Sequence, residues 1–226
     1  MLIQNNAIFI ADSHYNKERT DLHELLMQIK TCSLDVNQIF LMGDIFDFLT
    51  SELDYFISIN HQITSLINDL SLTHEILYLE GNHDYNLQEI FPTINIIPRE
   101  NQPFLVEQNN QKIALAHGDI FTPTFYNIYT AIIRNSSFLK FLNFFDVNNF
   151  ITKFTEEKLM HKKICFKQNN FLGFIHDRIN YYQADLIIEG HFHQGYISEK
   201  YINVPSLACG NQYMLYQNNQ FSFNTL

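Results

Sequence analysis

Short apolar runs alternate with amphipathic stretches along the first half of the chain. Apolar runs at residues 7–11, 38–42 and 75–79 predict buried strands. Between them lie two stretches, 22–29 and 53–70, whose apolar residues recur at helical spacing. Strands that alternate with helices are typical of parallel β-α-β units. This half of the sequence therefore predicts an α/β fold.

The second half changes character twice. Short strands are expected at 104–107 and 112–116, and a mostly helical region follows from 121 to 182. Strands then resume at 185–189, 196–197, 201–204, 212–216 and 221–223. A length of 226 residues suits one domain. We interpret residues 1–226 as a single domain into which 121–182 is inserted as a helical lid.

Polar motifs stand at the ends of five apolar runs. They are D-x-H at 12–14, G-D-x-x-D at 43–47, G-N-H-D at 81–84, H-G-D at 117–119 and G-H-x-H at 190–193. The carboxyl ends of strands in an open α/β sheet converge on one crevice, so these motifs are expected to meet there. A single Asp at a strand end usually caps a turn and a single His is usually structural, but such an ordered set is unlikely to arise by chance.

The residue types in these motifs indicate a metal site. Carboxylate and amide oxygens mixed with imidazoles suit Mn²⁺, Fe²⁺ or Zn²⁺ better than Ca²⁺. On a strict strand Asp12 and His14 would share one face, and His191 and His193 likewise. The candidate ligands are Asp12, His14, Asp44, Asn82, His117, His191 and His193. This set is too large for one tetrahedral ion and fits two ions that share a carboxylate.

From Phe9 to Val204 the chain resembles the calcineurin-like metallophosphoesterases, on the five motifs above. The resemblance implies a four-layer α/β/β/α sandwich with a dinuclear site at one rim. By motif, one ion would be held by Asp12, His14, Asp44 and His193, and the other by Asn82, His117, His191 and the bridging Asp44. We expect the two divalent ions to be Mn²⁺, with Fe²⁺ or Zn²⁺ as alternatives.

The same resemblance assigns roles beside the ions. His83 would stand near the phosphate and donate a proton or a hydrogen bond to the leaving oxygen, and Asn82 would help to neutralise developing charge. Asp84 would orient a ligating histidine, and Asp47 would do likewise. Two bound cations would clamp the phosphoryl group and activate a water molecule.

The region 121–182 is rich in aromatic and basic residues. It holds 15 of the 33 Phe and Tyr residues and 8 of the 14 Lys and Arg residues, so its charge is +4 against −14 for the rest. One interpretation is a helical pair whose Phe residues pack on the core. The other is a lid for an apolar, anionic substrate presented at a membrane surface. Arg134, Phe141 and Phe144 are the candidate substrate contacts.

Within the superfamily, this layout is similar to the UDP-2,3-diacylglucosamine pyrophosphatases of lipid A biosynthesis. The similarity includes the length, a helical lid at this place, and an H-G-D motif followed by Tyr126, Tyr129 and Arg134. It implies hydrolysis of this nucleotide-linked acylated sugar to UMP and 2,3-diacylglucosamine 1-phosphate. His83 stands where the best-known branch has Arg, and G-H-F-H-Q-G replaces G-H-T-H-R-P, which indicates a divergent branch.

Other classes fit less well. A net charge of −10 disfavours a nucleic-acid partner. Phe48, Leu49 and Asp84 differ from the residues that protein phosphatases and diadenosine tetraphosphate hydrolases have at these places. A generic soluble phosphodiesterase or phosphatase of the same superfamily stays open. A non-catalytic scaffold of this fold is disfavoured, because every metal-site histidine is present.

The chain shows no signal peptide and no apolar run long enough for a membrane span. We therefore expect a cytoplasmic protein that is peripheral at the anionic cytoplasmic face of the inner membrane. Three widely spaced cysteines, Cys32, Cys165 and Cys209, are expected to be reduced thiols.

Overall fold

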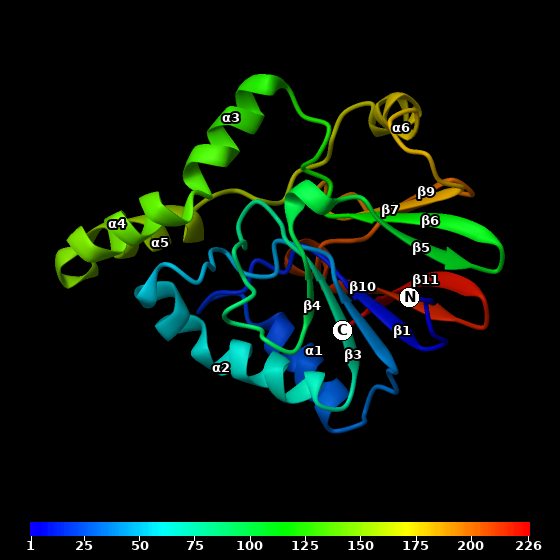
Figure 1. Ribbon diagram of the computed structural model, residues 1–226. Coiled ribbons are helices and arrows are strands. Elements are labelled where there is room, and N and C mark those ends of the chain that lie inside the picture. The colour runs from blue at the N-terminus through cyan, green and yellow to red at the C-terminus, as the bar shows by residue number, and fades with distance from the viewer.

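Two β-sheets packed face to face form the centre of the computed structural model, which describes residues 1–226 (Figure 1). The first sheet has six strands in the order β11-β10-β1-β2-β3-β4. Strands β1 to β4 are parallel, while β10 runs antiparallel to β1 and β11 antiparallel to β10. The bounds are β1 (Ala7–Ile10), β2 (Gln38–Leu41), β3 (Glu75–Leu79), β4 (Asn95–Ile97), β10 (Gln212–Gln217) and β11 (Gln220–Thr225).

The second sheet has five strands in the order β5-β6-β7-β9-β8. Its three inner strands are parallel and its two edge strands antiparallel to their neighbours. The bounds are β5 (Phe104–Gln108), β6 (Gln111–Ala116), β7 (Leu186–Glu189), β8 (Tyr196–Ile197) and β9 (Tyr201–Asn203). The predicted strands are therefore confirmed. Sequence analysis missed β4, whose three residues are too few to show a hydrophobic period.

Apolar side chains on both faces of the first sheet explain its unbroken apolar runs. Toward the second sheet, Phe9 stacks on Phe40 with ring centroids 4.4 Å apart, in one buried cluster with Leu115 and Ile188. Toward the other side, Ile8 and its neighbours pack on α1 (Asp21–Lys30) and α2 (Asp54–Ser71). Burial of two faces leaves no polar alternation in these strands.

Helix α6 (Phe171–Ile179) covers the outer face of the second sheet (Figure 1). Its Ile175 shares a buried cluster with Ala114, Ile187 and Tyr201 of that sheet. Together with α1 and α2 on the opposite side, this gives the order α/β/β/α. The four-layer sandwich expected from the sequence is confirmed.

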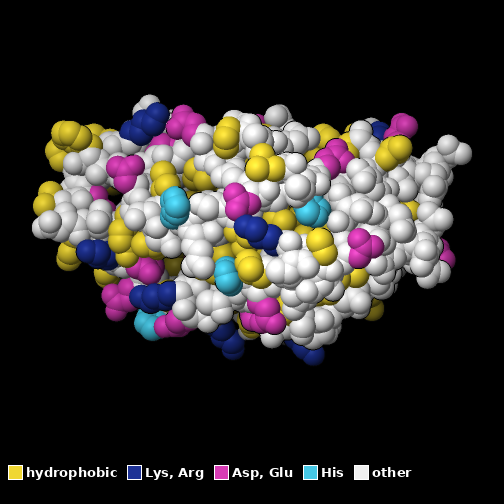
Figure 2. Space-filling view, turned by 90° about the horizontal axis from the view of Figure 1, so that it is seen from below, with side chains coloured by type: hydrophobic (Ala, Val, Ile, Leu, Met, Phe, Trp, Pro, Cys, Tyr) yellow, Lys and Arg dark blue, Asp and Glu magenta, His cyan; other side chains and the backbone are white.

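Three further helices project away from the sheets: α3 (Thr124–Ile133), α4 (Ser136–Phe145) and α5 (Phe150–Met160) (Figure 1). Helix α4 buries only Leu139, while Phe141 is 60% and Phe144 81% exposed. The interpretation in which the Phe residues of 121–182 pack on the core is therefore wrong for Phe141 and Phe144, although Phe171 and Phe174 of α6 do pack on the second sheet. Figure 2 shows hydrophobic side chains gathered with Lys and Arg side chains at the end of the molecule where α4 and α5 lie.

Cys165 and Cys209 form a disulfide, with Cα atoms 5.5 Å apart. The expectation that all three thiols are free is wrong for this pair and holds only for the exposed Cys32. The loop after α5 lies against the short helix α7 (Leu207–Gly210), which brings together residues 44 positions apart. The spacing of the cysteines along the sequence does not predict this contact. None of the helices combines the length and apolar content that crossing a membrane requires.

Candidate metal centre

The candidate ligands follow five strands of the two sheets. Asp12 and His14 come after β1, Asp44 after β2 and Asn82 after β3 in the first sheet; His117 comes after β6, and His191 and His193 after β7, in the second. Parallel strands place their carboxyl ends at one edge, and the two sheets bring their edges together at one rim. The sequence expectation of a shared site thus agrees with the topology.

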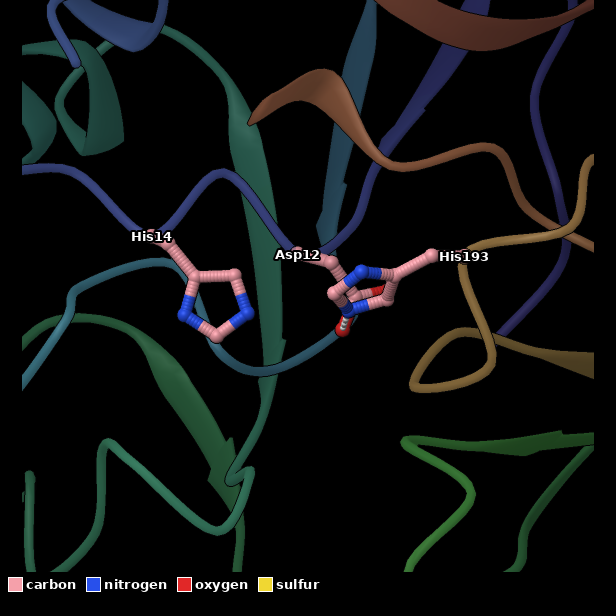
Figure 3. Close-up of side chains that lie close together, drawn as sticks. All are labelled: Asp12, His14 and His193. Atoms are coloured by element: carbon pink, nitrogen blue, oxygen red, sulfur yellow. Dashed lines mark ion pairs between the residues drawn. The ribbon is translucent and has the colours of Figure 1, made fainter. Parts of the chain in front are cut away.

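Two groups of acidic and imidazole side chains lie at this rim. Asp12, His14 and His193 have ligand atoms within 4.8 Å of one another, and so do Asp44, His117 and His191. In the first group His193 Nε2 is 3.2 Å from Asp12 Oδ1, and Figure 3 shows the His193 ring facing the Asp12 carboxylate from a separate loop. Each group resembles half of a dinuclear site.

Asp44 lies between the two groups. Its Oδ1 is 3.5 Å from His117 Nε2, and its Oδ2 is 3.9 Å from His14 Nε2. One carboxylate that faces both groups is the arrangement that a bridging ligand needs. Asn82 Oδ1 completes the second group at 3.3 Å from His117 Nε2.

The backbone is left-handed at five of these residues. The φ angles are 50° at Asp12, 41° at His14, 51° at Asp44, 64° at His191 and 57° at His193. Non-glycine residues seldom adopt this region, and where they do the surrounding structure holds them there, often at functional sites. The expectation that each pair shares a face of a regular strand is therefore wrong, because the pairs lie beyond β1 and β7 and converge through left-handed turns.

Two buried polar atoms in the first group have no hydrogen-bond partner: Asp12 Oδ1 and His14 Nδ1. Buried polar atoms rarely lack a hydrogen bond, so two that lack one and face only charged or imidazole neighbours in a group of ligand-type side chains fit a cation. Burial by itself would raise the pKa of Asp44, but His117 and His83 hold it well below the usual value. The Asp44 carboxylate is therefore ionised, as a metal ligand must be.

The pKa values in the second group, Asp44, His117 and His191, also fit a metal site. Burial and the neighbouring His117 lower the pKa of His191 to about 4, which leaves its imidazole neutral and able to ligate. Burial would lower the pKa of His117 as well, but Asp44 raises it to about 10. His117 is therefore protonated and supplies the positive charge beside Asp44. A metal ion bound there would displace that proton.

His83 lies buried beside the candidate ligands His14 and Asp44. Its backbone N–H donates to Asp44 Oδ1 over 2.8 Å, and its Nδ1 donates to the backbone oxygen of Asp47 over 2.6 Å. Because Nδ1 is engaged, Nε2 is the atom left for chemistry. His83 also lies within ligand distance of His14 and Asp44, so the geometry brings it into the metal centre itself.

The two expected supporting carboxylates behave differently. Asp47 Oδ1 is 3.5 Å from His14 Nδ1, in reach of a candidate ligand. Asp84 makes no hydrogen bond or ion pair with a histidine, contrary to its expected role: it accepts from the backbone N–H of Asp44 over 2.9 Å and from the Tyr78 hydroxyl over 2.6 Å. Asp84 therefore orders the backbone at Asp44. A Cβ at Gly81 would lie 2.4 Å from that same backbone nitrogen, which requires glycine there.

Of the candidate substrate contacts, Arg134 lies nearest to the centre. It caps the C-terminus of α3, and its Nη2 donates to the Gly81 backbone oxygen over 2.6 Å. The same nitrogen is 3.4 Å from Asp119 Oδ2 in the H-G-D motif, and the guanidinium lies over the Tyr85 ring. Arg134 thus joins the loops that carry Asn82 and His117. Phe141 and Phe144 lie on the projecting α4 and not at the metal centre.

Sequence analysis missed a buried ion pair behind the ligands. Arg178 of α6, counted among the basic residues of the helical region, is 6% exposed and donates two 2.6 Å hydrogen bonds to Glu189. Glu189 directly precedes Gly190-His191, and Arg178 Nη2 also donates to the Gly118 backbone oxygen over 2.6 Å. The pair therefore supports both loops of the second sheet. Its only sequence signal is an acidic residue that ends an apolar strand.

Comparison with known proteins decides the family. The family model described as calcineurin-like phosphoesterase matches residues 6–195. The chain belongs to this family. Members are metal-dependent phosphoester hydrolases, and the two groups of ligand-type side chains around Asp44 fit a dinuclear centre.

Individual relatives are distant. A curated UDP-2,3-diacylglucosamine hydrolase of Aromatoleum aromaticum is 26% identical over 120 residues, which cover 51% of this chain and 47% of that protein. The chain thus spans about half the length of this relative. Among solved structures, the phosphoesterase Yfce from E. coli has a TM-score of 0.49 at 14% identity, over 97% of this chain and 92% of that one. A Thermotoga maritima protein has a TM-score of 0.49 at 16% identity, over 99% and 100%.

Proposed function

We propose that this calcineurin-like phosphoesterase hydrolyses the pyrophosphate of UDP-2,3-diacylglucosamine to UMP and 2,3-diacylglucosamine 1-phosphate. The observation that carries the hydrolase chemistry is the position of Asp44 between the two groups of ligand-type side chains. The observation that supports an acylated substrate is the exposed aromatic surface of the projecting α4, which contains Phe141 and Phe144. The distant relative from Aromatoleum aromaticum carries this activity in its name.

The ligand set that we propose follows the motifs. Asp12, His14 and His193 would hold one divalent ion, Asn82, His117 and His191 the other, and Asp44 would bridge them. Bound there, the ions would act as Lewis acids on the phosphoryl group and provide an activated water. We propose Mn²⁺ as the native metal, because the mixed oxygen and imidazole ligands suit it.

The chain's own residues would do the rest. Nδ1 of His83 already donates to the Asp47 backbone oxygen, so in the protonated imidazole Nε2 is the nitrogen placed to donate to the leaving oxygen. Asn82 would donate from its amide nitrogen while its oxygen faces His117. Arg134 fixes the backbone at Gly81, and therefore the position of the next residue, Asn82.

The helical region would present the acylated substrate. Exposed Phe residues and a charge of +4 over residues 121–182 suit an anionic bilayer surface. The proposal places the protein at the cytoplasmic face of the inner membrane as a peripheral protein, with the acyl chains contacting α4. Within the expected lid of residues 121–182, the helices α3 to α5 would then act as the lid inserted into one domain of residues 1–226, while α6 forms a layer of the sandwich.

The test is direct. Purified protein is incubated with Mn²⁺ and UDP-2,3-diacylglucosamine, and UMP is quantified; an Asp44→Asn variant serves as the inactive control. UMP release that depends on both Mn²⁺ and Asp44 is the expected result. If bis-(p-nitrophenyl) phosphate is cleaved and no UMP forms, the lipid substrate is refuted and a general phosphodiesterase takes its place. If neither substrate is cleaved by the metal-loaded protein, the hydrolase proposal fails.

A further inference from the structure

A lysine from the helical region reaches the metal centre. Lys162 lies just after α5, and its Nζ is 3.4 Å from Nε2 of His83. His83 uses Nδ1 as a donor to a backbone oxygen, so in its neutral form Nε2 is the atom that accepts from this ammonium group. Lys162 forms no ion pair with any carboxylate of the chain. The Lys162 ammonium group thus faces the centre without a carboxylate partner.

The segment that carries this lysine is fastened to the sandwich. We call residues 161–170, which join α5 to α6, the strap. Gln194 holds it at two points, because its side chain donates to the Phe166 backbone oxygen and accepts from the Gln168 backbone N–H, each over 3.0 Å. Gln194 directly follows the ligand candidate His193. The strap therefore crosses the rim of the metal centre.

The disulfide adds a covalent fastening at the same place. Cys165 belongs to the strap, and Cys209 belongs to α7. Cys209 Sγ is 3.5 Å from His193 Nδ1, so the bond joins the strap to the sandwich beside a candidate ligand. Only two residues lie between Lys162 and Cys165, which leaves the lysine backbone little freedom while the disulfide is intact.

We propose that Lys162 binds a phosphoryl oxygen of the substrate and that the Cys165–Cys209 disulfide positions it by holding the strap across the site. This proposal rests on the proposed phosphoesterase function and adds a phosphate contact to the same centre. A phosphoryl oxygen beside His83 would compete for the Lys162 ammonium group, because a charged acceptor forms a stronger hydrogen bond than a neutral imidazole. Reduction of the disulfide would release the strap and weaken that contact.

The experiment measures orthophosphate binding to the Mn²⁺-loaded protein by calorimetry, together with kcat and KM for bis-(p-nitrophenyl) phosphate. The variant is Lys162→Ala. Its matched control is Lys163→Ala, because Lys163 is an exposed neighbour whose side chain makes no hydrogen bond or ion pair. Lys162→Ala is expected to weaken orthophosphate binding about tenfold, the effect of one charged hydrogen bond, and Lys163→Ala to leave it within about twofold. Equal effects of the two substitutions overturn the role of Lys162.

The role of the disulfide is tested by the same substitution in a Cys165→Ser/Cys209→Ser background, with Cys32→Ser as the thiol control. Without the disulfide, Lys162→Ala is expected to change orthophosphate binding by less than about threefold, since the contact is already weakened. A full tenfold effect in that background overturns the positioning role. The bound Mn²⁺ is quantified for every variant, so that loss of metal is not mistaken for loss of phosphate binding.

These outcomes are separable from failure of the proposed lipid substrate, because orthophosphate and the small ester stand in for the acylated sugar. Protein that binds Mn²⁺ and cleaves the small ester but not UDP-2,3-diacylglucosamine refutes the lipid substrate only, and the Lys162 comparison still decides this proposal. Wild-type protein that binds Mn²⁺ but neither orthophosphate nor the ester overturns both.

Discussion

Replacing Arg178 with Met is expected to destabilise the protein more than a change at any other basic residue of the helical region. Arg178 is 6% exposed and Glu189 is fully buried, and two hydrogen bonds of 2.6 Å join them. The Tyr201 hydroxyl donates to Glu189 Oε2 over 2.8 Å, and Tyr182 donates to Oε1. Removing the arginine would leave a buried carboxylate with only these neutral donors.

The magnitude follows from that burial. Breaking a buried ion pair by removing one partner costs about 3–5 kcal/mol, because the remaining charge is left uncompensated. For a chain of this size each kcal/mol lowers Tm by about 2–4 °C, so a fall of roughly 6–20 °C is expected. The double variant Arg178→Met/Glu189→Gln removes the buried charge and keeps an acceptor for the tyrosines. The free energy of unfolding of this double variant should fall by only about 1–2 kcal/mol relative to the wild type.

The assay is urea unfolding followed by circular dichroism, in excess chelator so that metal binding does not contribute. Lys163→Met is the control from an exposed position and is expected to stay within about 0.5 kcal/mol of the wild type. A fall of less than about 1 kcal/mol in the free energy of unfolding of Arg178→Met would contradict the cost of leaving Glu189 unpaired. A double variant no more stable than the single one would contradict it as well.

Three further predictions concern the centre and α4. Asp44→Ala is expected to stay folded, to bind less metal by elemental mass spectrometry and to lose hydrolysis; turnover by a folded variant would contradict the bridging assignment. Gly43→Ala would place a Cβ 2.5 Å from His117 Nδ1 at a φ of +87°. The free energy of unfolding in urea is therefore expected to fall by at least about 1–2 kcal/mol. A variant as stable as the wild type would contradict this geometry. The double variant Phe141→Ser/Phe144→Ser should leave Tm unchanged, because both side chains are exposed. It should reduce turnover of the acylated substrate and sedimentation with anionic vesicles. An equal loss of turnover on the small ester would mean that the two Phe side chains do not contact acyl chains.

The sandwich could be predicted because its signals are local. Runs such as 7–11 and 75–79 are apolar throughout, since both faces of those strands are buried, and polar motifs follow them directly. Parallel strands of one sheet end at one edge, so the order of the motifs was enough to expect that Asp12, Asp44 and Asn82 would meet. The identities of the candidate ligands needed no coordinates.

Other features depend on contacts between distant segments. The left-handed backbone at Asp12 and His14, the use of Asp84 to hold backbone amides, and the burial of Arg178 on Glu189 all arise from neighbours far along the chain. Local sequence patterns do not predict contacts between residues that are far apart along the chain.

What the sequence alone determined is therefore the layered α/β architecture and the set of ligand-type residues, because hydrophobic period and motif order are properties of short stretches. What only the tertiary structure decided is the exposure of Phe144, the Cys165–Cys209 disulfide and the approach of Lys162 to His83. Each of these depends on how the helical region lies against the sandwich. That placement is set by packing and hydrogen bonds between segments that the sequence separates by tens of residues.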